Sequence, residues 1–183
     1  MRIISGKARG TKLYTLEGLN TRPTLDRVKE SIFNILQNEI QGANVLDLFA
    51  GSGAIGLEFL SRGANSVLLC DKSKEAIEII KKNIEKTHME QSAQVINMDF
   101  ETCLEKIKNQ KFDIIYLDPP YETDYIFKSL KKILELNLMT ESGLIITETD
   151  DEERIEKEIE NIKVKIVDKR KYGRATIIFL EKA

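Results

Sequence analysis

Residues 45–56 read Val-Leu-Asp-Leu-Phe-Ala-Gly-Ser-Gly-Ala-Ile-Gly, and this stretch decides the expected fold class. Its first four residues form a short, mostly apolar run, which predicts a buried strand. Gly51 and Gly53 allow a tight turn after the strand, and the residues beyond them predict a helix that ends near Gly63. A strand, a glycine turn and a helix in this order begin an α/β unit with parallel strands.

The alternation of strand and helix continues beyond this unit. Apolar runs predict strands over residues 66–71, 93–98, 112–117, 144–148, 164–169 and 175–180. Apolar residues at helical spacing predict a helix after Ser73 and three more, around 103–107, around 126–134 and over 151–161. We therefore expect a doubly wound, mainly parallel sheet with right-handed crossovers and with helices on both faces.

The residues before this sheet are predicted to form an extension of it. Residues 1–15 alternate around Gly6 and Gly10, which predicts a short hairpin or an extended arm. Residues 24–40 predict a helix that is entered through Pro23. The sequence thus divides into a hairpin with a helix, residues 1–40, and a sheet domain, residues 41–183.

Length and composition narrow the class of protein. The chain of 183 residues has 42% hydrophobic and 32% charged residues, which is typical of one globular domain. No apolar run approaches the ~18–20 residues of a membrane span, and the first residues lack the apolar core of a signal peptide. Cys70 and Cys103 are far apart and outside any CxxC motif, so neither a disulfide nor a zinc site is expected. We expect a metal-free, monomeric protein in the cytoplasm.

Charge is unevenly distributed along the chain. Residues 1–29 contain seven basic and two acidic residues, a balance of +5, whereas the whole chain carries −2, so the remainder carries −7. A basic arm on an acidic body predicts that one face meets a polyanion such as nucleic acid, and a solvated basic terminus is the alternative. The predicted nucleic-acid-binding residues are Arg2, Lys7, Arg9, Lys12, Arg22 and Arg27.

The glycine turn predicts a site for a cofactor that contains adenosine. Gly51, Gly53 and Gly56 satisfy the G-x-G-x-x-G pattern, and Asp71 follows Gly51 by twenty residues, where a carboxylate can accept hydrogen bonds from ribose. These residues alone do not choose between NAD and S-adenosylmethionine. Asp47 favours S-adenosylmethionine, because a carboxylate there repels a pyrophosphate and attracts an ammonium group. The predicted cofactor-binding residues are Asp47, Phe49, Ala50, Gly51, Gly53, Asp71, Lys72, Asp99 (adenine amino group, helix N-cap, or both) and Phe100.

Asp118-Pro119-Pro120-Tyr121 follows the predicted strand 112–117 and is the predicted catalytic motif. Two prolines restrict the backbone and remove two donors, so the carbonyl of Pro119 can face a ligand. Asp118 supplies a second acceptor and can take a proton, and Tyr121 supplies an aromatic face for stacking on a base. Two acceptors on the two N–H bonds of a nucleobase amine would align its nitrogen for attack on a methyl group.

Together these motifs resemble the class I methyltransferases that modify amino groups, and specifically the RsmD family of bacterial small-subunit rRNA guanine-N2 methyltransferases. The resemblance extends to residues 3–10, 22–34, 47–58, 118–121 and 172–175, so it covers essentially the whole chain. It implies a Rossmann-like, doubly wound α/β fold with seven strands, the last of them antiparallel. It also implies methyl transfer from S-adenosylmethionine to N2 of a guanine in 16S rRNA, in the small subunit or its assembly intermediates. On this basis residues 1–40 would face RNA, with residues 22–27 beside the cofactor and target base, and residues 41–183 would be the catalytic domain.

Four alternatives remain open from the residues themselves. Methylation of adenine N6 in DNA or RNA, or of a glutamine amide in a protein, would use the same pair of acceptors. An NAD-dependent oxidoreductase would explain the glycines and Asp71, and it would leave residues 118–121 without a purpose. An RNA-binding assembly factor without catalysis would explain only the basic arm.

Overall fold

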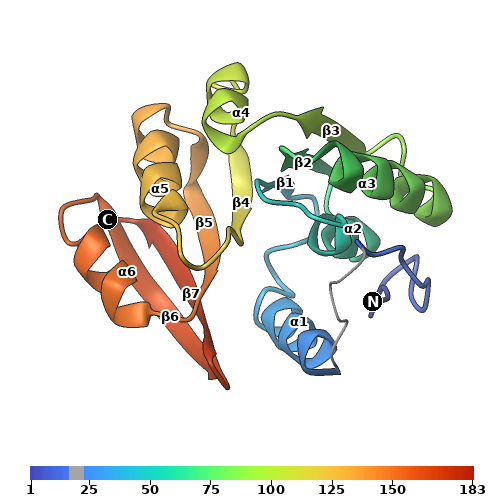
Figure 1. Cartoon of the computed structure of the whole chain (residues 1–183), viewed down its shortest axis with the longest axis horizontal. Coiled ribbons are helices and arrows are strands. Elements are labelled where there is room, and N and C mark those ends of the chain that lie inside the picture. Colours follow the sequence, from blue (N-terminus) through green and yellow to red (C-terminus); the bar gives the residue numbers. More distant parts are fainter. Residues whose placement is uncertain (17–22) are drawn as a thin grey trace.

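The computed structural model describes residues 1–16 and 23–183, and it describes side chains for residues 1–16 and 26–183 (Figure 1). Arg22 lies outside the described residues. The helices and strands are, in chain order, α1 (Pro23–Ile35), β1 (Asn44–Asp47), α2 (Ala54–Ser61), β2 (Ser66–Asp71), α3 (Lys74–Thr87), β3 (Ala93–Asn97), α4 (Phe100–Lys106), β4 (Phe112–Leu117), α5 (Tyr125–Glu135), β5 (Met139–Thr149), α6 (Glu152–Ile159), β6 (Val164–Tyr172) and β7 (Ala175–Lys182).

The strands form one seven-stranded sheet in the order β3-β2-β1-β4-β5-β7-β6. The first five strands of this order pair in parallel, whereas β7 is antiparallel to both β5 and β6. The expected mainly parallel α/β sheet with an antiparallel last strand is therefore confirmed. The order reverses between β1 and β4, which is the position where parallel α/β sheets bind ligands.

Alternation along the strands produces a hydrophobic core on each face of the sheet. In β1, Val45 faces one core and Leu46 faces the other, because successive side chains of a strand point to opposite faces. Helices α1, α2 and α3 cover the first face, and α4, α5 and α6 cover the second. The sheet is thus buried on both sides, and the carboxyl ends of its parallel strands remain available for a site.

The N-terminal arm, residues 1–16, packs on the same face as α1 and α2. A single antiparallel bridge joins Arg2 to Lys12, and Ile3 and Leu13 insert into the core beneath α1. The arm therefore shares a core with the sheet. The functional division at residue 40 stays a prediction.

Several predicted boundaries differ from the observed ones. The predicted helix 24–40 ends at Ile35, and residues 36–39 form turns that bring buried Ile40 back to the core before β1. The predicted strand 144–148 is longer in both directions, because Met139 pairs with Phe112 of β4 before an irregularity in the register and Thr149 pairs with Thr176 of β7. The predicted strand 164–169 extends to Tyr172, where a two-residue turn closes the β6–β7 hairpin.

None of the helices in the described residues, 1–16 and 23–183, is long and apolar enough to cross a membrane. Across the same residues, no group of three or more His, Cys, Asp or Glu side chains is arranged to hold a metal ion.

Candidate active site

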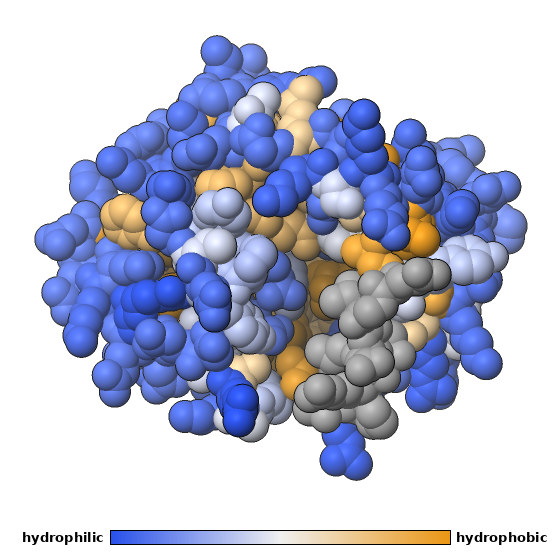
Figure 2. Space-filling view, viewed as in Figure 1, coloured by the Kyte–Doolittle hydropathy of each residue, from blue (hydrophilic) through white to orange (hydrophobic). Residues whose placement is uncertain are grey.

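A cavity of about 730 Å³ lies across the carboxyl ends of β1, β2, β3 and β4. It gathers residues from four separate loops and from the first turns of α4 and α5. Its lining consists of Leu48, Phe49, Gly51, Asp71, Lys72, Met98, Asp99, Phe100, Glu101, Asp118, Pro119, Pro120, Tyr121, Tyr125 and Lys128. Most of the face in Figure 2 is hydrophilic, and apolar surface gathers in its hollowed centre.

The glycines of the turn after β1 have different roles. A Cβ at Gly56 would lie 2.7 Å from a methyl carbon of Leu69, so this glycine lets α2 pack closely on β2. Gly51 has a φ of +55° and borders the cavity, and a Cβ there would meet no protein atom within 4 Å. Since packing does not require a glycine at position 51, the backbone at this position is open to a ligand.

Asp71 holds the turn in place from the end of β2. Its Oδ2 accepts the Gly51 N–H at 2.9 Å, and its Oδ1 accepts the Ser73 N–H at 2.8 Å. A carboxylate oxygen has further lone pairs, so both oxygens can still accept hydrogen bonds from hydroxyl groups. Asp71 is half-buried at the cavity wall, where the sequence predicted a ribose-binding carboxylate.

Asp47 lies beneath the turn and does not line the cavity. Its side chain is buried, and its Oδ2 accepts the Gly56 N–H at 3.1 Å. Burial raises its pKa to about 7, against the opposing effect of the Gly56 hydrogen bond, and the negative charge of Asp71 adds to the rise. The predicted contact between Asp47 and an ammonium group stays a prediction.

Three aromatic rings form a wall of the cavity. Phe49 follows β1, Phe100 begins α4 and Tyr125 begins α5. The centroids of Phe100 and Tyr125 are 4.8 Å apart, and the rings of Phe49 and Tyr125 are nearly parallel at 6.2 Å. Such a wall suits a flat, partly apolar ligand. Sequence reasoning missed Tyr125, whose only signal was its position at the start of an amphipathic helix.

Asp99 caps α4, as one of its two predicted roles requires. Its side chain accepts from both the backbone N–H and the hydroxyl of Thr102, and these bonds lower its pKa. Asp99 also lines the cavity, so the second predicted role, as acceptor for an adenine amino group, remains geometrically open.

The tetrapeptide 118–121 forms the part of the cavity that follows β4. The Pro120 carbonyl accepts from the backbone N–H and the hydroxyl of Thr123. In the part of the chain that the structure describes, no donor bonds to the Pro119 carbonyl. Two acceptors, Asp118 and the Pro119 carbonyl, are thus adjacent and available to a ligand.

The Asp118 side chain is exposed to the open cavity, and its pKa is nevertheless raised to about 8. The surrounding walls remove part of its hydration, which has the largest effect, and the negative charges of Glu148 and Asp47 add to it. Water in the cavity screens these charges in part, and the direction of the shift remains upward. A cationic ligand beside Asp118 would reverse this effect.

Tyr121 is fixed by two groups from β5 and α6. Its hydroxyl donates to Glu148 Oε1, and its carbonyl accepts from the Arg154 guanidinium at 3.0 Å. Burial, the hydrogen bond to Glu148 and the negative charge of Glu148 raise the pKa of Tyr121. Asp47, Asp118 and Glu148 thus place three carboxyl groups at the ends of the neighbouring strands β1, β4 and β5. Sequence reasoning missed Glu148 and Arg154, because no local pattern connects them with residue 121.

The predicted RNA-binding residues that the structure describes lie apart from this cavity. Arg2, Arg9 and Arg27 line a second cavity of about 410 Å³, together with Asp26 and Glu30. Lys7 and Lys12 are exposed on the arm. Arg27 therefore lies beside the arm, and it is absent from the lining of the first cavity, where the resemblance implied it would be close to the cofactor.

Two buried polar residues attach the arm to the body. Glu58 on α2 accepts from the Ile4 and Ser5 N–H groups, and it also pairs with Lys29 and Arg62. These contacts fix the first half of the arm against α1 and α2.

Asn83 on α3 holds the other end of the arm. Its Oδ1 accepts the Tyr14 N–H at 2.8 Å, and its Nδ2 donates to the carbonyls of Tyr14 and Ser52, each at 2.9 Å. Because Ser52 lies between the two glycines of the turn, one buried side chain contacts both the arm and the turn.

The structure thus brings most of the predicted cofactor-binding and catalytic residues to one cavity. Ten predicted residues line it: Phe49, Gly51, Asp71, Lys72, Asp99, Phe100, Asp118, Pro119, Pro120 and Tyr121. Three do not, namely Asp47, Ala50 and Gly53, which support the turn from behind.

The sheet order, the antiparallel β7 and a cavity at the carboxyl ends of the parallel strands define a class I methyltransferase fold. A family model described as "Conserved hypothetical protein 95" matches residues 1–181. "Ribosomal RNA small subunit methyltransferase D" of Haemophilus influenzae is 40% identical over 153 residues, which are 82% of this chain and 79% of that protein. The chain belongs to this family, the RsmD family.

Two further comparisons agree with this assignment. The Escherichia coli protein named "Ribosomal RNA small subunit methyltransferase D" is 34% identical over 150 residues, 82% of this chain and 75% of that protein. The solved structure of yhhF from Escherichia coli has a TM-score of 0.84 at 28% identity and covers 100% of this chain and 97% of that chain.

Proposed function

We propose that this protein transfers a methyl group from S-adenosylmethionine to the N2 amine of a guanine in small-subunit rRNA. The observation that carries the proposal is the pair of acceptors, Asp118 and the Pro119 carbonyl, beside a cavity with a glycine turn. Relatives named as small-subunit rRNA methyltransferases support rRNA as the substrate.

The chemistry of the cavity fits S-adenosylmethionine. Asp71 would accept from the ribose hydroxyls, Asp99 from the adenine amino group, and the wall of Phe49, Phe100 and Tyr125 would contact apolar parts of the ligand. The open backbone at Gly51 leaves room for the ligand's approach. When bound, this cofactor supplies a methyl group that is activated by a positively charged sulfur.

Asp118 and Pro119 would hold and align the amine. Each acceptor takes one of the two N–H bonds, so the lone pair of the nitrogen is directed at the methyl carbon. This alignment is the main catalytic effect, since effective molarities of well-oriented groups correspond to roughly 7–11 kcal/mol. The nitrogen would form the new N–C bond as the bond between the methyl carbon and sulfur breaks, with the sulfur keeping that electron pair, and Asp118 in its carboxylate form would take the proton that the nitrogen releases.

Tyr121 would stack on the base. Stacking of this kind contributes about 1–3 kcal/mol in the binding of single strands. A paired or stacked guanine must be extruded before its amine reaches a cavity between strand ends. The hydrogen bonds from Tyr121 to Glu148 and from Arg154 fix the ring before the base arrives, which reduces the entropy lost on binding.

The arm would contribute sequence-independent affinity for RNA. Arg2, Arg9 and Arg27 converge on one cavity, and arginine binds phosphate oxygens in a fixed geometry. Lys7 and Lys12 would add charge to the same surface. Affinity that depends on such contacts falls steeply with salt.

The test is transfer of labelled methyl groups to small ribosomal subunits from cells that lack the protein, followed by nucleoside analysis. We expect label in N2-methylguanosine, with Asp118→Ala retaining S-adenosylmethionine binding and losing transfer. Asp113→Ala is the matched control, because Asp113 lies at the opposite end of β4 and accepts from the Asn44 N–H. Label in N6-methyladenosine, or none in rRNA, would overturn the proposal.

A further inference from the structure

Glu148 lies next to Asp118 at the catalytic edge of the sheet. Leu117 of β4 pairs with Thr147 of β5, so Asp118 and Glu148 are the next residues on two adjacent parallel strands. Aligned residues of paired strands point to the same face. In agreement with this placement, the negative charge of Glu148 is the largest charge effect on Asp118.

Glu148 also contacts the residue proposed to stack on the base. Its Oε1 accepts the Tyr121 hydroxyl, and Tyr121 lines the cavity. Its Oε2 can accept another hydrogen bond, because among the described residues only the Tyr121 hydroxyl donates to this carboxylate, at Oε1. Glu148 is half-buried and lies behind the lining of the first cavity, in contact with Tyr121 and next to Asp118, which both line it.

The amino groups of guanine and adenine differ in their neighbours. In guanine the N2 amine stands beside N1–H, so two donors point the same way. In adenine the N6 amine stands beside N1 without a hydrogen, so a lone pair occupies the equivalent position. A carboxylate next to the acceptors of the amine therefore attracts guanine and repels adenine.

We propose that Glu148 is the residue that selects guanine, by accepting its N1–H while Asp118 and the Pro119 carbonyl hold its N2 amine. This inference rests on the proposed function and adds its specificity determinant. The position at the end of β5, one strand from Asp118, and the contact with Tyr121 place a second carboxyl group beside the two acceptors proposed to hold the amine.

The experiment compares two bases at one position. Nucleoside mapping with the wild-type protein first identifies the methylated guanine. Small subunits are then reconstituted with rRNA that carries guanine or 2-aminopurine there. 2-Aminopurine keeps the amine and has a lone pair at N1. We expect the wild-type protein to prefer guanine by about 10- to 100-fold in kcat/KM, the discrimination typical of one specific base contact.

Glu148→Gln is the informative variant. An amide can accept from N1–H of guanine or donate to N1 of 2-aminopurine, so we expect the preference for guanine to fall by at least about tenfold. 2-Aminopurine also lacks O6, but this difference is the same for both proteins and cancels in the comparison. An unchanged preference in Glu148→Gln overturns the inference.

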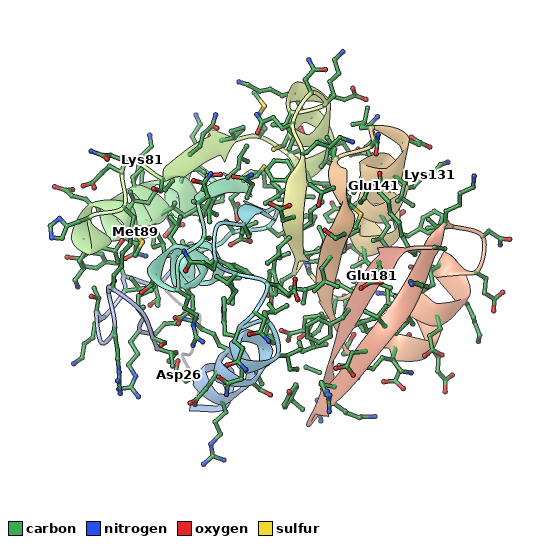
Figure 3. All side chains as sticks on the ribbon, turned by 180° about the vertical axis from the view of Figure 1, so that it is seen from behind. Asp26, Lys81, Met89, Lys131, Glu141 and Glu181 are labelled. Atoms are coloured by element: carbon green, nitrogen blue, oxygen red, sulfur yellow. The ribbon has the colours of Figure 1, made fainter. Side chains whose placement is uncertain are left out.

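Two controls separate specificity from folding and stacking. Glu141→Gln changes an exposed glutamate at the opposite end of the same strand (Figure 3) and is expected to leave the preference unchanged. Tyr121→Phe removes the hydroxyl and keeps the ring and the Glu148 carboxylate, so the preference should remain even if the rate falls. If the wild-type protein produces N6-methyladenosine, the proposed function itself fails. If it produces N2-methylguanosine and Glu148→Gln retains full preference, only the inference fails.

Discussion

Lys29 Nζ lies 2.9 Å from Glu58 Oε2, and both side chains are buried, with 5% and 0% of their surfaces exposed. This pair joins α1 to α2, the helix that follows the glycine turn. Burial opposes the charge of Glu58, but Lys29, the Ile4 N–H and Arg62 outweigh it and hold the pKa of Glu58 below its ordinary value. One carboxylate therefore determines how the arm, α1 and α2 fit together.

Glu58→Gln should destabilise the protein by about 3–5 kcal/mol, because it leaves Lys29 as a buried charge without its partner. Urea unfolding measures the loss. Glu78→Gln, at an exposed position on α3, should change stability little. A Glu58→Gln midpoint equal to that of the wild-type protein would contradict the assigned role.

The same carboxylate predicts how stability depends on pH. Since the folded-state pKa of Glu58 is lowered, its contribution is present above the unfolded-state value of about 4.3–4.5 and is lost as pH falls through the folded-state value. The wild-type protein should therefore lose stability more steeply than Glu58→Gln as pH decreases below about 4.5. Parallel pH profiles would contradict this prediction.

Asn83→Leu should loosen the end of the arm. The substitution leaves the Tyr14 N–H and the carbonyls of Tyr14 and Ser52 without their partner, and the loss at the buried Ser52 carbonyl costs about 1–3 kcal/mol. Hydrogen exchange of the Tyr14 amide should accelerate. Lys82→Leu, at the neighbouring exposed position, should leave this exchange unchanged.

Gly51→Ala and Gly56→Ala should separate ligand binding from packing. At Gly51 the added methyl group meets no protein atom, so the variant folds with a loss of about 1–2 kcal/mol from its positive φ, and cofactor affinity falls. At Gly56 the methyl group is crowded by Leu69, so the main effect is a stability loss of about 1–3 kcal/mol. Calorimetric titration and thermal unfolding of both variants test the distinction, and wild-type affinity in Gly51→Ala would refute it.

The raised pKa of Asp118 predicts a pH-dependent preference for the cationic cofactor. Below about pH 8 the free protein holds a proton on Asp118, and a positive sulfonium favours its release. The affinity for S-adenosylmethionine relative to S-adenosylhomocysteine, which lacks that charge, should rise from pH 6 to 8 and then level off. Titration of Asp47 should change the affinities for both ligands to a similar extent, because both ligands carry the same ammonium group. In Asp118→Asn the ratio should not change with pH.

The parts of the site that the sequence predicted are those encoded locally. The glycine turn and residues 118–121 are short motifs that end predicted strands, and the parallel arrangement of the strands brings them together at one edge. Glu58, Asn83 and Glu148 were missed because their partners lie 54, 69 and 27 residues away in the chain. Their side chains acquire a role only when the packing of α2, α3 and β5 is known.

The extent of β5 was underestimated for a related reason. Thr140, Glu141, Ser142 and Gly143 have the composition of a turn and lie at an irregularity in the β4–β5 register, and the pairing of Met139 with Phe112 before them involves a distant part of the chain. The helix before β1 was overestimated, because buried Leu36 and Ile40 continue the helical spacing although the chain has already turned. Periodicity records which residues are buried, and it does not distinguish a helix from a turn that returns to the same core.

The row of carboxyl groups at the ends of β1, β4 and β5 has a consequence for how a polyanion can approach. Once a cationic sulfonium has favoured release of the proton from Asp118, this edge repels a phosphodiester chain and does not repel a neutral base. This edge therefore keeps phosphate groups away from the reacting atoms and admits an uncharged base. On the proposed function, RNA must keep its phosphates outside, against the arginines of the arm, and present a single base inward, so that exclusion of the backbone and extrusion of the base become one event.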